Sequence, residues 1–281
     1  MKMKNRQAIR PARVVVFIAL CIYAVVQLYP LFWLIMFSLK DNKQIFGGNA
    51  LGLPKPWVFE NYVVAFKNAK VGTYLFNSII VTGLSIFFVI LLSTMASYAI
   101  ARLRWKYSNA FLLFITTGMM IPVHASLLPL FLNFSKLGIL NTRASLIIPY
   151  VGFGLALATN IMTMFFKSVP LELEEAAIID GCNLRQNFTY VMVPMVKPAI
   201  TTVAIFTYLD TWNELMFANT FINKAEYKTL TVGIMSLVGE YATSWGPIGA
   251  GLVIATIPSI IGYMLVSKKL PESISAGAVK G

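Results

Sequence analysis

The sequence predicts an all-α membrane protein with six transmembrane helices. Of its 281 residues, 58% are hydrophobic and only 12% are charged, whereas soluble domains carry about 25% charged residues. Six apolar stretches reach the length of about 20 residues that a helix needs to cross a bilayer. They cover approximately 14–37, 75–101, 109–134, 144–166, 196–221 and 248–267.

The amino-terminal stretch 1–13 is basic, as the start of a signal peptide is, but the apolar run after it is too long for one. A signal peptide has an apolar core of about 7–15 residues followed by a small-residue cleavage site. The run 14–37 exceeds that length, and no such site follows it. We therefore expect an uncleaved first transmembrane helix.

The basic residues favour a cytoplasmic location for both ends of the chain. The sequence has 23 Lys and Arg against 11 Asp and Glu, a formal net charge of +12. Dense basic clusters lie in 1–13 and 102–106, and short basic connections are typical of the cytoplasmic side. With six spans, 1–13, the polar stretch 170–198 and the tail 268–281 are then all cytoplasmic. The charge thus indicates membrane orientation and no nucleic-acid partner.

Few residues could bind a metal or carry a proton. His124, the only histidine, lies between Pro122 and Pro129 in the third span, where the prolines predict a kinked or broken helix. A lone histidine there is more often hydrogen-bonded to a neighbouring helix, or near the surface, than a ligand or proton carrier. Cys21 and Cys182 lie at different expected depths, so the sequence indicates neither a disulfide nor a metal site.

The first external connection, 38–74, is long and rich in glycine, proline and aromatic residues. Aromatic side chains are typical of the membrane–water interface. We therefore expect a small folded cap at the outer surface of the membrane, with a disordered loop as the alternative.

The fifth span carries a polar run near its outer end. Counting from Lys197 at the cytoplasmic surface, Asp210 lies about 20 Å along a helix that rises 1.5 Å per residue. Asp210 and Glu214 are four residues apart and would share one helix face, which must avoid lipid. With Trp212 and Asn213 they combine an aromatic ring with carboxylate and amide groups, a chemistry suited to sugars. The alternative is that this run only marks the end of the helix.

The polar stretch 170–198, called the elbow below, predicts a short helix that begins near Pro170. Proline suits the first turn of a helix, and the glutamates that follow it place negative charge where a helix N-terminus favours it. The helix should end at Gly181, the residue that most easily adopts a left-handed C-cap conformation. An ordinary polar loop is the alternative on composition alone.

A second helix of the elbow is expected to start near Asn183 and to run into the fifth span. Pro194 and Pro198 should disturb its path, because proline removes a backbone donor. The two helices would form a helix-turn-helix outside the bilayer.

The elbow resembles the EAA loop of bacterial ABC-importer permeases. That loop reads Glu-Ala-Ala, three residues, Gly, nine residues, and an apolar residue two before Leu-Pro. The matching residues are Glu175, Ala176, Ala177, Gly181, Val191 and Pro194, with Val193 in place of the leucine. Weaker matches follow in the expected order, and include Phe76-Asn77-Ser78, Ser97-Tyr98-Ala99 and Trp212-Asn213-Glu214. The chain therefore resembles permeases of the carbohydrate-uptake class along nearly its whole length.

The resemblance implies the ABC type I importer permease architecture, with 14–267 as the transmembrane domain and the elbow as its coupling helix. It also implies that the elbow docks on a separate ATPase. The coupling residues implied are Glu175, Ala176, Ala177, Asp180, Gly181, Arg185 and Pro194.

The partners implied are a second permease subunit in a heterodimer, two ATPase subunits that hold ATP and Mg, and an extracytoplasmic sugar-binding protein, all at a bacterial inner membrane. The chain has no G-x-x-x-x-G-K-[ST] phosphate loop, so ATP hydrolysis by that mechanism belongs to a separate subunit. We expect a transport subunit that is no enzyme, with no cofactor or metal of its own.

The expected function is the movement of a sugar, a di- or oligosaccharide, into the cytoplasm, with Asp210, Trp212, Asn213 and Glu214 along the substrate pathway. An ion-coupled secondary transporter with Asp210 and Glu214 as proton or sodium sites is one alternative. An ABC permease for a non-sugar solute is another, which the elbow alone does not exclude.

Overall fold

The computed structural model describes residues 11–103, 105–238 and 243–267, and every regular element in these ranges is a helix. The chain forms two compact units, 1–69 with 237–254 and 70–236 with 255–281. The basic residues before position 11 and the tail 268–281, both expected to be cytoplasmic, lie outside the described residues.

Four of the described helices are long and apolar enough to cross a membrane. They are α1 (Pro11–Ser38), α4 (Val71–Arg102), α7 (Ala144–Ser168) and α14 (Trp245–Ser267). Two bent pairs of helices raise the number to six if each pair forms one span. The all-α membrane fold is therefore confirmed, and its long helices begin and end within a few residues of the expected bounds.

In the first unit, the connection after α1 is folded around Lys40. Helices α2 (Asn42–Phe46) and α3 (Glu60–Lys67) form within it. Lys40 is fully buried, and its Nζ donates to the carbonyl oxygens of Asn49 at 2.6 Å and Ala50 at 2.9 Å. Burial lowers the pKa of Lys40, because desolvation penalises an ammonium group. The expectation of a folded connection, rather than a disordered loop, is confirmed.

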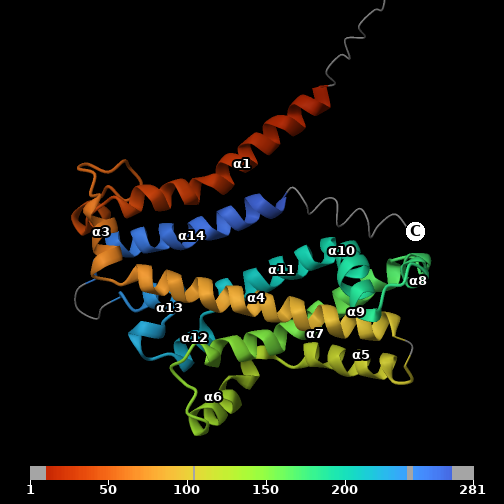
Figure 1. Ribbon diagram of the computed structural model, residues 1–281. Coiled ribbons are helices and arrows are strands. Elements are labelled where there is room, and N and C mark those ends of the chain that lie inside the picture. Colours follow the sequence, from red (N-terminus) through yellow and green to blue (C-terminus); the bar gives the residue numbers. More distant parts are fainter. Residues whose placement is uncertain (1–10, 104, 239–242, 268–281) are drawn as a thin grey trace, which may run out of the picture. The chain divides into compact units, whose positions relative to one another are not determined.

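In the second unit, α4, α7 and α11 (Lys197–Trp212) pack side by side (Figure 1). Small residues bring α4 and α7 close together: a Cβ added at Gly154 would lie 3.0 Å from Val89, and Ser97 Oγ donates to the Thr159 carbonyl at 2.9 Å. Small residues permit such close helix packing in membranes. The core here is formed by Val89, Tyr98, Ala158, Met162, Phe166, Val169, Met192, Val196, Ala199 and Val203.

The third expected span is broken, as its prolines predict. Helix α5 (Ser108–Thr117), with the 3₁₀ turn Gly118–Met120, meets the segment Val123–Lys136 at an angle of 86°. The break falls at Pro122. Pro129 lies in the first turn of α6 (Leu127–Lys136), where its missing N–H costs little.

The prediction that the fifth span, 196–221, forms one continuous helix was wrong. Helix α11 ends at Trp212, and a separate short helix, α12 (Met216–Phe221), follows after three residues. The physical reason lies at Glu214, whose carboxylate accepts backbone hydrogen bonds from Phe217 at 2.8 Å and Ala218 at 3.1 Å. These bonds satisfy two of the backbone N–H groups that the start of α12 leaves free, which stabilises α12 as a separate helix.

The connection between α12 and α13 (Leu230–Met235) is held by Asn77 of α4. This fully buried amide donates to the carbonyl oxygens of Glu226 and Lys228, both at 2.9 Å. Its Oδ1 accepts from Arg143 Nε at 3.1 Å and Nη2 at 2.9 Å. One asparagine therefore joins three segments that are far apart in the sequence.

Candidate functional site

The elbow begins where Pro170 ends α7. Val169 is extended (φ −71°, ψ 131°), as a residue before proline tends to be. Helix α8 (Glu172–Ile179) therefore starts two residues after Pro170 rather than at it, with three glutamates in its first turn. The expected helix is confirmed, with a slightly later start.

Gly181 terminates α8 as the sequence predicts. Its φ is +87°, a left-handed conformation that glycine adopts without a steric penalty. Gly181 N donates to the Ile178 carbonyl at 3.0 Å and Cys182 N to the Ala177 carbonyl at 2.9 Å. These two bonds form a Schellman C-cap.

The second helix of the elbow starts after Asn183, also as expected. Asn183 and Gln186 form a capping box, in which each side chain accepts from the other's backbone N–H at 2.9 Å. After α9 (Leu184–Gln186) comes a π-helical segment, Asn187–Met192, and then α10 (Val193–Met195). The segment Leu184–Met195 meets α11 at an angle of 73°.

A buried ion pair joins the elbow to the end of α4. Arg102 Nε lies 3.3 Å from Glu174 Oε2, and only 5% and 11% of the two side chains are exposed. Arg102 Nη2 also donates to the Val169 carbonyl at 2.5 Å. The first helix of the elbow is thus fixed to a transmembrane helix.

The expected coupling residues divide into a buried and an exposed set. Ala177 packs inward and is 7% exposed, so it is not available to a partner. The residues that face outward are Glu175, Ala176, Asp180, Gly181, Arg185 and Pro194. Two apolar side chains not singled out from the sequence, Ile178 and Ile179, are 62% and 85% exposed beside them. The signal that the sequence contained is a pair of adjacent isoleucines within a polar stretch expected to lie outside the bilayer.

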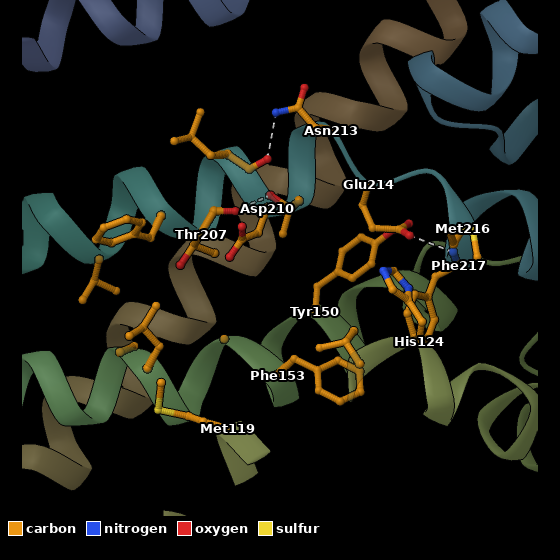
Figure 2. A pocket seen from close by; sticks show the side chains of 18 of the residues that line it. Met119, His124, Tyr150, Phe153, Thr207, Asp210, Asn213, Glu214, Met216 and Phe217 are labelled. Atoms are coloured by element: carbon orange, nitrogen blue, oxygen red, sulfur yellow. Dashed lines mark hydrogen bonds between the residues drawn. The ribbon is translucent and has the colours of Figure 1, made fainter. Parts of the chain in front are cut away.

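The second unit also holds a cavity of about 660 Å³, lined mainly by α7, α11 and the segment after α11. Its walls include aromatic side chains from Tyr150, Phe153, Phe206 and Phe217. Polar groups reach it as well, and Figure 2 shows His124, Tyr150 and Glu214 together toward one end. The cavity therefore combines aromatic surface with hydrogen-bonding groups.

Three of the four expected pathway residues line this cavity: Asp210, Asn213 and Glu214. Their positions differ from the expectation, because Glu214 lies beyond the end of α11 and does not share a helix face with Asp210. The Glu214 carboxylate accepts from the Tyr150 hydroxyl in addition to two backbone N–H groups. The Asp210 carboxylate accepts no hydrogen bond from any residue that the structure describes.

Trp212 does not line the cavity. It is two residues from Asp210, which places it on a different face of α11. Its ring stacks on Tyr208 with centroids 5.5 Å apart, and its Nε1 donates to the Ala255 carbonyl at 3.3 Å. The aromatic side chains of the cavity come from other positions, which only the packing of α7 and α11 reveals.

His124 lines the cavity, and the structural role that the sequence favoured for it stays a prediction. Its ring is 6.4 Å from that of Phe217, centroid to centroid. The described residues contain no group of three or more His, Cys, Asp or Glu side chains that could hold a metal ion.

An all-helical membrane chain with an internal cavity and a helical elbow fixed to its spans has the features expected of a membrane transport subunit. Residues 92–271 match the family of binding-protein-dependent transport system inner membrane components. This match covers more than half of the chain, which therefore belongs to that family. The protein is a multi-pass inner-membrane ABC transporter permease and not an enzyme.

Two relatives and one solved structure illustrate the similarity. The chain is 35% identical to the probable ABC transporter permease protein YurM of Bacillus subtilis, over 95% of this chain and 88% of that protein. It is 34% identical to the sulfoquinovosyl glycerol transport system permease protein SmoH of Agrobacterium fabrum, over 94% and 93%. A bacterial ABC transporter involved in the import of the acidic polysaccharide alginate matches with a TM-score of 0.81 and 26% identity, over 95% and 99%.

Proposed function

We propose that this chain is the permease subunit of an ATP-driven importer that moves a di- or oligosaccharide into the cytoplasm. The observation that carries the proposal is the elbow: Arg102 and Glu174 fix it to α4, and it presents Ile178 and Ile179 outward. Exposed apolar side chains on a polar, capped helix favour a protein contact. The ATPase cleft is the partner surface that fits this position.

The proposed coupling surface consists of Glu175, Ala176, Ile178, Ile179, Asp180 and Arg185, with Gly181 shaping the turn. Two ATPase subunits with bound ATP and Mg would close and move the elbow as a rigid part. Because Arg102 joins the elbow to α4, that motion would reach the transmembrane helices directly. Rigid-body motion of packed helices is a common way to switch access between two sides.

A saccharide fits the cavity between α7 and α11. Sugar hydroxyl groups need hydrogen-bond partners, which Asp210, Asn213 and Thr207 supply there. The C–H faces of sugar rings pack on aromatic side chains, and Phe153 and Phe206 line the same space. Relatives named for sulfoquinovosyl glycerol and alginate transport support the same class of solute.

The remaining partners are a second permease subunit in a heterodimer and an extracytoplasmic sugar-binding protein. The family description, which names binding-protein dependence, supports the latter. Both termini and the elbow would lie in the cytoplasm, in keeping with the basic clusters of the short connections.

The test compares two exposed apolar positions in the reconstituted transporter. Ile179→Glu should prevent co-purification of the ATPase and abolish ATP-driven saccharide uptake into proteoliposomes. The control, Leu137→Glu, changes a side chain that is 70% exposed and lies outside the elbow, and it should retain the ATPase. ATPase binding and uptake at wild-type levels in the Ile179 variant would contradict the coupling role.

A further inference from the structure

We infer that the cavity between α7 and α11 admits uncharged and amino-bearing saccharides and disfavours acidic ones, with Asp210 as the residue that sets this preference. The inference rests on the proposed function, because it takes a saccharide as the solute.

The first observation is the charge of the cavity wall. Asp210 and Glu214 line it, His124 is the only other ionisable side chain there besides Tyr150, and none of the lining residues is a lysine or arginine. The chain as a whole has an excess of basic residues. The cavity wall thus carries acidic groups and no basic ones, although the net charge of the whole chain is positive.

The second observation is that the two carboxylates are not equivalent. Glu214 accepts hydrogen bonds from Tyr150 and from the backbone N–H groups of Phe217 and Ala218. These contacts hold it in place at the start of α12 and use most of its acceptor capacity. Asp210 has an exposed side chain and no hydrogen-bond or ion-pair partner among residues 11–103, 105–238 and 243–267. Asp210 is therefore the carboxylate that a solute can reach.

The third observation is what lies beside Asp210. Phe206 is one helical turn earlier on α11 and is 45% exposed; residues four apart share a helix face. Figure 2 shows Asp210 on the side of α11 that faces α7, across from Phe153. A sugar ring against these aromatic side chains would place its hydroxyl groups within reach of the carboxylate.

These features together set a charge preference. A hydroxyl group donates to Asp210, and an ammonium group gains an ion pair as well. A uronate or sulfonate meets a like charge in an apolar surrounding with no basic side chain to compensate, and like-charge contact is a strong source of discrimination. Because the relatives named above include carriers of acidic saccharides, this preference distinguishes the chain from them.

The first arm of the test measures the cavity's potential without any sugar, so it is independent of the proposed function. In the purified complex, assembled with partner subunits whose cysteines are replaced, Cys21→Ala and Cys182→Ala remove the two thiols of this chain. Phe206→Cys then places one thiol in the cavity. The rates at which a cationic and an anionic methanethiosulfonate of similar size modify this thiol are measured. Their ratio is divided by the same ratio for a small thiol in solution, which removes the intrinsic difference in reactivity between the two reagents. We expect the cationic reagent to be favoured, and Asp210→Asn to shift the ratio about threefold or more toward the anionic one. Glu226→Gln, an exposed carboxylate outside the cavity wall, should leave the ratio unchanged.

The second arm measures the equilibrium binding of three matched β-1,4-linked trimers to the complex of permease and ATPase subunits, with the binding protein left out. They are cellotriose, its amino counterpart glucosamine trimer, and its oxidised counterpart glucuronic acid trimer. The acidic trimer should bind at least tenfold more weakly than the other two, and Asp210→Asn should remove most of that difference. Equal or tighter binding of the acidic trimer, or no effect of Asp210→Asn on the thiol rate ratio, would overturn the inference and leave ATP-driven saccharide import intact. Binding of none of the trimers would overturn it together with the proposed saccharide class.

Discussion

Arg102 and Glu174 form a buried ion pair, 3.3 Å between Nε and Oε2, that joins the end of α4 to the first helix of the elbow. Buried ion pairs gain little net stability, because desolvation offsets the attraction, but breaking one leaves an uncompensated charge. The value of this pair is therefore in fixing the position of the elbow.

Glu174→Gln should lower the thermal stability of the complex and uncouple it. Loss of one partner of a buried pair costs about 3–5 kcal/mol, and a loosened elbow would transmit less motion. We expect ATP hydrolysis to continue while saccharide uptake per ATP falls at least fivefold. The control is Glu172→Gln, which changes an exposed carboxylate in the same helix. Equal uptake per ATP in the two variants would show that the ion pair has no part in coupling.

Gly181→Val should impair uptake more than Gly181→Asn. At a φ of +87° a β-carbon costs about 1–2 kcal/mol, and asparagine tolerates this conformation better than a β-branched residue. A Cβ at this position would meet nothing within 4 Å, so the effect would come from the backbone alone. ATP-driven uptake in proteoliposomes is the measurement, and equal uptake by both variants would argue against a role for the turn.

Gly233→Ala should destabilise the second unit. A Cβ at Gly233 would lie 2.0 Å from Cδ2 of Tyr74, a side chain that is only 5% exposed, and overpacking costs about 1–3 kcal/mol. Gly83→Ala is the matched control, because it also adds one methyl group within a helix but meets nothing within 4 Å. The unfolding midpoint of the purified protein should fall only for Gly233→Ala; a fall of the same size in both would contradict the close approach.

Asn77→Ala should loosen the connection between α12 and α13. The substitution removes two donated and two accepted hydrogen bonds from a fully buried site, and each buried group left unpaired costs about 1–3 kcal/mol. Proteolysis or hydrogen exchange of residues 222–230 should increase. The control is Asn219→Ala, at an exposed position of α12, which should leave the proteolysis and hydrogen exchange of that segment unchanged. If Asn77→Ala also left them unchanged, the hydrogen-bond network of Asn77 would have no part in holding the connection.

Local sequence signals predicted the elements well. Apolar length located the long helices, Gly181 and Asn183 marked the turn of the elbow, and Pro122 marked the break in the third span. Each of these features depends on neighbours a few residues away. The apolar residues that follow Glu214 led to an expected span that continues to 221, whereas α11 ends at Trp212. The alternative interpretation, in which the polar run marks the end of the helix, is the one that agrees with this end.

The site depended on contacts between distant residues. Arg102 and Glu174 are 72 positions apart, and no local pattern pairs them. The aromatic walls of the cavity, and the presence of His124 there, follow from how α7 and α11 pack. The orientation of Trp212 was accessible from helical periodicity, since residues two apart on a helix point in different directions.

The energy source of transport is the most direct test of the whole account. Proteoliposomes should contain this chain with its second permease, ATPase and binding protein, or this chain alone under an imposed proton or sodium gradient. We expect saccharide uptake by the complete complex when ATP and Mg are present on the side of the membrane that the ATPase faces. The chain alone should show no uptake. Gradient-driven uptake by the lone chain without ATP would contradict the account and favour a secondary transporter.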